Sequence, residues 1–149
     1  MKLAIGCDEA GYLMKETLRD HLQSRGFAPT DFGVGVGQTA HYPDIAFSVA
    51  QSVAEGDHDR AILICGTGIG MCISANKVRG IRAAQAHDTY SAERAQKSNN
   101  AQILCLGARV LGAELAKAIV DAWLGSHFEG GRSTEKVERI SEFEVKNFR

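Results

Sequence analysis

A single thiol stands at the end of an apolar run and directly before a glycine-rich turn. Residues 61–65 read AILIC, and GTGIG follows Cys65 at 66–70. A turn of this kind between a strand and a helix presents backbone N–H groups to an anion. The same donors favour the thiolate form of a cysteine, which can act as a nucleophile or as a base that removes a proton. The motif therefore predicts an anion site with Cys65 as its reactive group.

Other chemistries fit this turn less well. It reads GxGxG rather than GxGxxG, and 149 residues leave no room for a separate substrate domain, so a dinucleotide site is disfavoured. No P-loop pattern and no cysteine-protease signature occurs. A purely structural role in close strand-to-helix packing stays open. Proton abstraction beside a carbonyl needs one base, oxyanion donors and an acid, and Thr67 with the backbone of 66–70 can supply the donors.

Further polar residues follow or precede the expected strands. Asp8 and Glu9 come after the first strand, where they either cap the next helix or bind substrate hydroxyls. Tyr42 lies in a loop before a proline, and Asn99 lies before a strand, where a turn role is the alternative. Three cations, at Arg109, Arg132 and Lys136, lie in or after loops and together can clamp a phosphate.

The elements that must position these residues alternate in type along the chain. Apolar runs indicate strands at 3–7, 27–33, 61–65, 80–86 and 102–107, and helical spacing indicates helices at 12–25, 44–56, 70–78, 88–98 and 111–124, with a charged helix within 130–144. Such alternation with short connections predicts an α/β fold with a doubly wound parallel sheet covered by helices. No linker or repeat divides residues 1–149, so we expect one domain.

Composition limits the function classes. The net charge of −1 gives no support for binding to nucleic acid or to an anionic membrane. No apolar run approaches the roughly 18 residues of a membrane span, and the N-terminus does not read as a signal peptide. The four cysteines form no CxxC or zinc pattern. We therefore expect a soluble cytoplasmic protein with reduced thiols.

Seven segments together resemble one family, the type B ribose-5-phosphate isomerases and galactose-6-phosphate isomerases. They fall in family order over nearly the whole chain: GCDEAG (6–11), HYPD (41–44), ILICGTGIGM (62–71), ANKVRGIRAA (75–84), SNNAQIL (98–104), LGARVLG (106–112) and FEGGR (128–132). The resemblance implies a Rossmann-like three-layer α/β/α sandwich with a five-stranded parallel sheet. It also implies a homodimer or homotetramer with shared active sites, and we expect the C-terminal helix, 134–144, to pack on the partner subunit.

The activity implied by the resemblance is aldose–ketose isomerisation of a sugar phosphate through an enediolate, without metal or cofactor. Cys65 looks like the base that moves the proton between C1 and C2. The other implied roles are enediolate stabilisation by Thr67 and the amides of Gly66, Gly68 and Gly70, contacts to the sugar by Asp8, Tyr42 and Asn99, and a phosphate clamp of Arg109, Arg132 and Lys136, part of it from the other subunit.

The chain also departs from the family pattern. Type B ribose-5-phosphate isomerases usually carry histidine at the positions of Glu9 and Ser98, and the second histidine is the family's proposed acid/base for ring opening. A later Arg is here Lys136, and GGRH ends in Ser133 instead. A serine hydroxyl does not titrate near pH 7 and is a poor substitute for imidazole.

These departures lead to a hypothesis about the substrate. A sugar phosphate that is already acyclic, such as a tetrulose 4-phosphate, needs no ring-opening residue. The alternatives are ribose 5-phosphate with Glu9 in place of the lost imidazole, or a hexose 6-phosphate such as galactose 6-phosphate. A non-catalytic sugar-phosphate-binding subunit is a further alternative, disfavoured by the presence of Cys65 and Thr67. A small nucleotide-binding protein is the least favoured reading.

Overall fold

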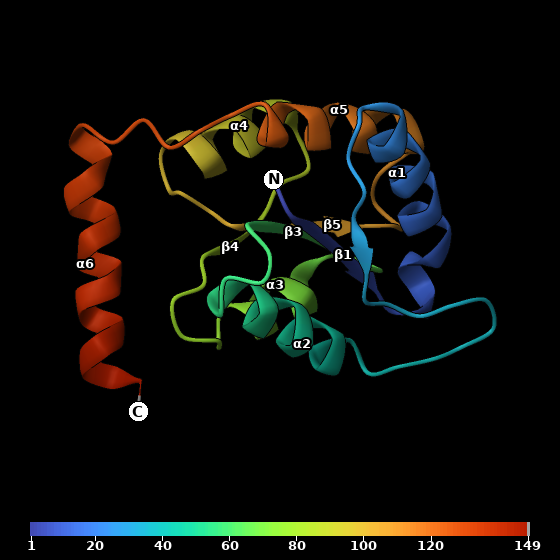
Figure 1. Cartoon of the computed structure of the whole chain (residues 1–149), viewed down its shortest axis with the longest axis horizontal. Helices are drawn as coiled ribbons and strands as arrows, with labels where there is room; N and C mark the ends of the chain where they lie inside the picture. Colours follow the sequence, from blue (N-terminus) through green and yellow to red (C-terminus); the bar gives the residue numbers. More distant parts are fainter. Residues whose placement is uncertain (149) are drawn as a thin grey trace.

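The sheet of this protein is entirely parallel and lies between two layers of helices (Figure 1). The computed structural model describes residues 1–148. The strands are β1 (Leu3–Cys7), β2 (Thr30–Asp31), β3 (Arg60–Cys65), β4 (Ala83–Gln85) and β5 (Ile103–Gly107), in the order β2-β1-β3-β5-β4. The predicted five-stranded parallel sheet is confirmed.

Two strands are shorter than the sequence predicts. β2 was expected over 27–33, but only two residues pair with β1, and Pro29 just before them has no N–H to donate. β4 was expected over 80–86. It begins only at Ala83, because side chains accept the amides before it: Gly80 N donates to Glu144 and Arg82 N donates to Gln102 Oε1.

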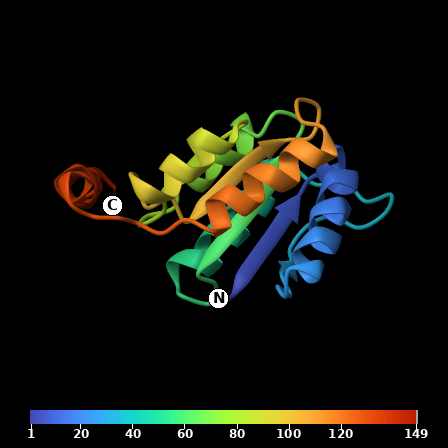
Figure 2. The ribbon, with the colours of Figure 1, turned by 90° about the horizontal axis from the view of Figure 1, so that it is seen from above.

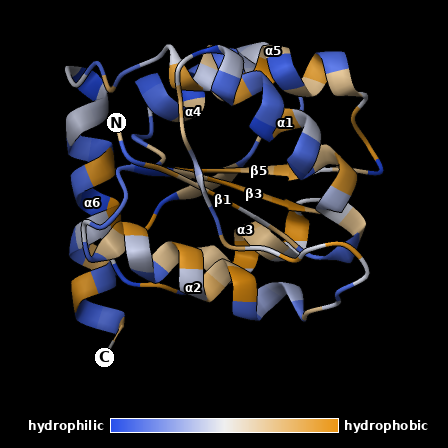
Figure 3. Ribbon diagram, turned by 45° about the vertical axis from the view of Figure 1, so that its right-hand side comes forward, coloured by the Kyte–Doolittle hydropathy of each residue, from blue (hydrophilic) through white to orange (hydrophobic). Residues whose placement is uncertain are grey.

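The helices divide between the two faces of the sheet. They are the short 3₁₀ helix η1 (Glu9–Gly11), α1 (Tyr12–Ser24), α2 (Tyr42–Ala54), α3 (Ile69–Ala75), α4 (Thr89–Lys97), α5 (Ala113–Leu124) and α6 (Arg132–Asn147). Along β1, Leu3, Ile5 and Cys7 pack with α1, α4 and α5, whereas Ala4 packs with α2 and α3. Figure 3 shows the apolar strands between these layers. The predicted three-layer α/β/α sandwich is confirmed.

The strand order creates a crevice between β1 and β3. The chain leaves β1 toward α1 on one face and leaves β3 toward α3 on the other. In open α/β sheets, ligands bind at such a point, outside the carboxyl ends of the strands. Asp8 directly follows β1 and Cys65 ends β3, so the fold brings the first two candidate residues to this crevice.

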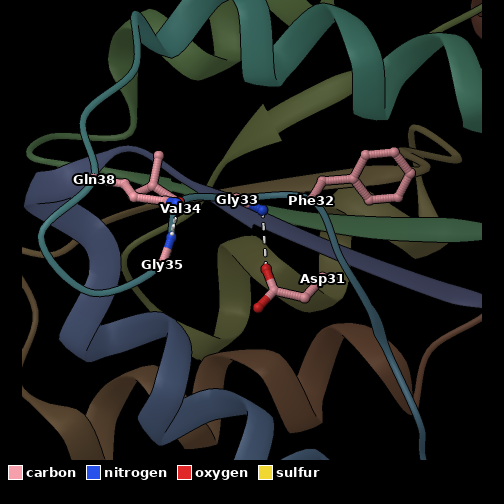
Figure 4. Close-up of a pocket in the computed structure, with 6 residues that line it drawn as sticks. All are labelled: Asp31, Phe32, Gly33, Val34, Gly35 and Gln38. Atoms are coloured by element: carbon pink, nitrogen blue, oxygen red, sulfur yellow. Dashed lines mark hydrogen bonds between the residues drawn. The ribbon is translucent and has the colours of Figure 1, made fainter.

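A buried lysine fixes the loop that leads from β2 to α2. Lys15 is 1% exposed, and its Nζ donates to Asp31 Oδ2 at 2.8 Å, to the carbonyl of Gly33 at 3.0 Å and to that of Val34 at 2.8 Å. Figure 4 shows the loop around a cavity of about 280 Å³, with Gly33 N donating to Asp31 and Gly35 N donating to Gln38. The start of the segment that carries Tyr42 is thereby anchored to α1.

Helix α6 stands apart from the sandwich (Figures 1 and 2). It begins two residues before the expected 134 and continues to Asn147, beyond the expected 144. Val137 is its one buried residue among those described, whereas Ile140 is 50% and Phe143 66% exposed. Over residues 1–148, no helix combines the length and apolar character needed to cross a membrane.

Candidate active site

A cavity of about 390 Å³ lies at the β1–β3 crevice. Its lining comes from four separate segments: Asp8 after β1, Tyr42 at the start of α2, Arg109 after β5, and Cys65, Gly66, Thr67, Ile69, Gly70 and Ile73 from the end of β3 and from α3. The structure thus brings together the predicted base, the glycine turn, one predicted cation and two predicted sugar ligands. The apolar wall of Ile69 and Ile73 was not foreseen.

The turn after β3 is built around the Cys65 sulfur. Gly68 N donates to Cys65 Sγ at 3.1 Å, and Ile69 N donates to Thr67 Oγ1 at 3.2 Å. Gly68 has φ of 78°, and a Cβ there would lie 2.8 Å from the Leu106 carbonyl carbon. Only glycine fits this position without strain, because it has no Cβ and readily adopts positive φ. Cys65 is therefore held in a turn that supplies a donor to its sulfur.

The four thiols differ in their surroundings. Burial raises the pKa of Cys7 to about 12 and also raises the pKa of Cys105. Cys72 is half-buried on α3, and a hydrogen bond with the Cys105 side chain lowers its pKa to about 7. Cys65 alone of the four lines the cavity. Position and not burial singles out Cys65, which therefore remains the candidate for chemistry here.

Asp8 caps a short helix and also lines the cavity. Its Oδ1 caps η1 by accepting from Ala10 N at 3.1 Å and Gly11 N at 3.2 Å. Burial raises the pKa of this carboxyl. Both capping bonds end on Oδ1, so Oδ2 remains for a ligand hydroxyl as far as residues 1–148 are concerned. Asp8 therefore caps the helix and lines the cavity at once.

Glu9 lies outside this cavity. It is exposed, and its Oε2 accepts from Ala40 N at 3.3 Å. Hydrogen bonds from its own backbone N–H and from that of Ala40 lower its pKa. It lines a separate pocket with Thr39, Ala40 and His41. The structure therefore does not bring Glu9 together with Cys65.

Tyr42 covers the start of α3. It was expected in a loop, but it is the first residue of α2, because His41 takes the N-cap position and Pro43 occupies the first turn, where its missing N–H costs nothing. The Tyr42 ring packs directly over Gly70, where any Cβ would collide with it. Gly70 therefore makes room for a side chain as well as lining the cavity.

Arg109 places a cation above the glycine turn. A Cβ on Gly66 would lie 3.2 Å from Arg109 Nη1, so the guanidinium passes close over that residue. The backbone fixes this placement, since Ala108 N donates to the Cys65 carbonyl at 2.9 Å and Arg109 N donates to the Gly66 carbonyl at 3.0 Å. The cavity thus joins a thiol, backbone donors and one guanidinium.

The remaining predicted site residues lie near the opposite end of the strands, where β5 begins. Cys65 pairs with Gly107 at the carboxyl end of β5, whereas Ser98 and Asn99 precede the start of that strand. A strand of this length spans about 13 Å. Glu129 N donates to the Lys97 carbonyl, which ties the segment before Arg132 to the same edge. Within one chain, Ser98, Asn99, Arg132 and Lys136 are therefore separate from Cys65.

Ser98 is engaged by a neighbouring arginine. Its Oγ accepts from Arg94 Nε at 3.0 Å and from Arg94 Nη2 at 2.6 Å. Arg94 also lies 3.9 Å from Glu129, on the segment before α6. Nothing in the sequence motif indicated this arginine. The hydroxyl at the position of the family's second histidine is thus an acceptor held by a permanent cation.

Two residues of the site region escape sequence reasoning. Gln85 Nε2 donates to the Thr67 carbonyl at 2.6 Å, and His87 Nε2 accepts from Gly107 N at 3.1 Å. Gln85 is the last residue of β4, and His87 follows it. Both reach their partners because β4 pairs with β5. The only signal in the sequence is that a polar residue stands at the end of an expected strand.

Comparison with known proteins gives consistent matches over nearly the whole chain. A family model described as Ribose/Galactose Isomerase matches residues 3–140. A D-erythrulose-4-phosphate isomerase of Pectobacterium atrosepticum is 56% identical, over 97% of this chain and 95% of its own. A ribose-5-P isomerase B of Listeria innocua is 55% identical, over 99% of both. The structure of Clostridium thermocellum ribose-5-phosphate isomerase B superposes with a TM-score of 0.95 at 46% identity, covering 98% of this chain and 99% of that one.

Proposed function

Because the chain belongs to the ribose/galactose isomerase family and is a sugar-phosphate isomerase, we propose that it interconverts an acyclic tetrulose 4-phosphate and its aldose. Relatives named for the tetrulose phosphate and for ribose 5-phosphate are 56% and 55% identical, so overall identity does not choose between them. The observation that carries the proposal is Ser98, bound to Arg94 where ribose-5-phosphate isomerases usually have histidine.

The proposed chemistry starts at Cys65. Its thiolate removes a proton from C1 of the ketose, which gives an enediolate with negative charge on the former carbonyl oxygen. The same thiol returns the proton to C2, while the hydroxyl proton on O1 passes to O2, and the aldose with its carbonyl at C1 results. The Gly68 amide is already bonded to the sulfur, so the donors for the enediolate are the Thr67 hydroxyl and the amides of Gly66 and Gly70.

Ring opening separates the two candidate substrates. Ribose 5-phosphate closes to a furanose, and general acid–base help in opening it is worth about 10²–10⁴-fold. A tetrose 4-phosphate cannot form a five-membered ring, because the oxygen on its fourth carbon is esterified. The Ser98 hydroxyl accepts two N–H groups from Arg94 and does not titrate near neutral pH. Such a group suits a substrate that never closes a ring.

Restoring histidine at Ser98 tests this reading. We expect Ser98→His to raise kcat/KM for D-ribose 5-phosphate about tenfold or more, since an imidazole can assist ring opening. Turnover of D-erythrulose 4-phosphate should not improve. Steady-state kinetics with both sugars measure the effect, and Ser98→Ala is the matched control. A large gain on the tetrulose phosphate in Ser98→His would sink the proposal.

We further propose that a second copy of the chain completes each site. The cavity holds one guanidinium, Arg109, while Arg132 and Lys136 stand at the far edge of the sheet. The C-terminal helix also exposes Ile140 and Phe143, which burial against a partner would remove from water. In a symmetric dimer, α6 of one subunit can bring Arg132 and Lys136 to the other subunit's Cys65, and the segment between α4 and β5 can bring Ser98 and Asn99 to the same site. A homotetramer would pair two such dimers.

We place the enzyme in the cytoplasm. The proposed base is Cys65, and it must remain a free thiol to act. Reducing compartments keep thiols in that form. The reaction as written uses only side chains, backbone donors and the substrate's own atoms, so we propose no cofactor and no metal.

A further inference from the structure

We propose that Gln85 is a positioning residue for Cys65, acting through the single peptide group that joins Thr67 to Gly68. This inference rests on the proposed role of Cys65 as the base. Gln85 is not among the residues that line the cavity. It stands at the end of β4, two strands away from β3 in the sheet.

The geometry is a two-step hydrogen-bond chain. Gln85 Nε2 donates to the Thr67 carbonyl at 2.6 Å, and the N–H of the same peptide group, that of Gly68, donates to Cys65 Sγ at 3.1 Å. In a trans peptide the C=O and N–H lie in one plane and point in opposite directions. Fixing the carbonyl on one side therefore fixes the direction of the N–H on the other, toward the sulfur.

This peptide group needs an external anchor. Gly68 follows it with φ of 78°, and glycine gives the backbone more conformational freedom than any other residue. The β5 strand packs against the carbonyl side, since a Cβ on Gly107 would lie 2.7 Å from the Thr67 oxygen. The Gly107 amide donates to His87 instead, so within residues 1–148 Gln85 supplies the hydrogen bond to this carbonyl.

These two linked hydrogen bonds also make the Gly68 N–H a stronger donor. A hydrogen bond accepted by a peptide carbonyl polarises the group and makes its N–H a better donor. A donor to sulfur favours the thiolate over the thiol, because hydrogen bonds to charged groups are the stronger ones. Gln85 therefore both aims the Gly68 N–H at Cys65 Sγ and makes it a better donor to the sulfur.

Removal of the Gln85 donor tests the inference. We expect Gln85→Leu and the isosteric Gln85→Glu each to lower kcat at pH 7 about tenfold, with KM nearly unchanged, since a charge-assisted hydrogen bond is weakened. The lost activity should return as the pH is raised. The rate of Cys65 alkylation by iodoacetamide should show a midpoint about one pH unit higher than in the parent.

The alkylation must be read in a Cys72→Ser background. Cys72 is half-buried, and the Cys105 hydrogen bond lowers its pKa to about 7, so we expect it to be alkylated too. Gln102→Leu is the matched control. Gln102 also bridges backbone groups, accepting from Arg82 N at 2.8 Å and donating to the Gly80 carbonyl at 2.9 Å, but it does so before β5, away from Cys65. The Gln102→Leu substitution should lower the stability of the fold without changing the pH midpoint of Cys65 alkylation.

The outcomes separate this inference from the proposed function. An alkylation midpoint that stays in place in both Gln85 variants would overturn the inference, even if kcat falls. A midpoint that rises as far in Gln102→Leu would overturn it too. If Cys65→Ser kept full turnover, the assignment of the base would fail, whereas the alkylation midpoint would still report whether Gln85 acts on the thiol.

Discussion

Replacing Cys65 by serine lowers kcat by about 10³-fold in our account, because a positioned base contributes about 10²–10⁴-fold to proton transfer. Serine fits the turn and can still accept from Gly68 N, so the fold and the cavity should persist. Its hydroxyl does not ionise near neutral pH and cannot remove a proton from carbon at a useful rate. Steady-state turnover measures the loss, and thermal stabilisation by the sugar phosphate shows that binding is retained.

Cys72→Ser is the control for this experiment. Cys72 lies on α3, the helix that follows Cys65, and is half-buried, but it does not line the cavity. Its replacement should leave kcat within about twofold, as expected for a side chain outside the reaction. A Cys65→Ser enzyme that kept more than about a tenth of its turnover would remove Cys65 from the role of base. A protein with no turnover in any form would be a binding subunit instead.

Two inactive variants should recover activity when they are combined. Arg132→Ala is expected to lower kcat/KM about 10²-fold, because charge-assisted bonds to the phosphate are lost. Cys65→Ser is inactive for a different reason. When the two are unfolded and refolded together, half of the dimers are mixed, and each mixed dimer has one site with both residues intact. The mixture should therefore show about one quarter of the parent activity if the site is shared across a two-fold axis.

The matched control pairs Cys65→Ser with Arg109→Ala. Arg109 lines the same cavity as Cys65 within one chain, so no mixed dimer contains a complete site. This pair should stay inactive on mixing. Recovery of activity there, or its absence with Arg132→Ala, would contradict the proposal that Cys65 and Arg132 come from different subunits.

The sequence alone predicts the layers of the fold and the placement of two candidate site residues, Asp8 and Cys65. Alternating apolar strands and amphipathic helices predict a parallel sheet, and a parallel sheet places Asp8 and Cys65 at the same edge. The predicted turn between a strand and a helix is also present, and within it Gly68 adopts positive φ and donates to Cys65 Sγ. These features depend on residues close in sequence or on adjacent strand ends.

The features of the site that the sequence does not predict depend mostly on contacts between segments that are distant in the sequence. Gln85 reaches Thr67 only because β4 lies beside β5, and one polar residue at a strand end does not reveal that contact. Arg94 on α4 and its C-cap residue Ser98 are four residues apart, but helices carry many pairs at this spacing, so the sequence does not single this one out. The helix α2 begins at Tyr42 and not after the predicted loop, because a proline such as Pro43 is as compatible with the first turn of a helix as with a loop.

Side-by-side turnover of D-erythrulose 4-phosphate and D-ribose 5-phosphate by the purified protein tests the central claim most directly. We predict that kcat/KM for the tetrulose phosphate exceeds that for the pentose phosphate by about 10²-fold or more, the value of the acid–base help that Ser98 lacks. Equal or faster turnover of ribose 5-phosphate would contradict the account. It would mean that water or another residue opens the furanose, and that Ser98 does not mark an acyclic substrate.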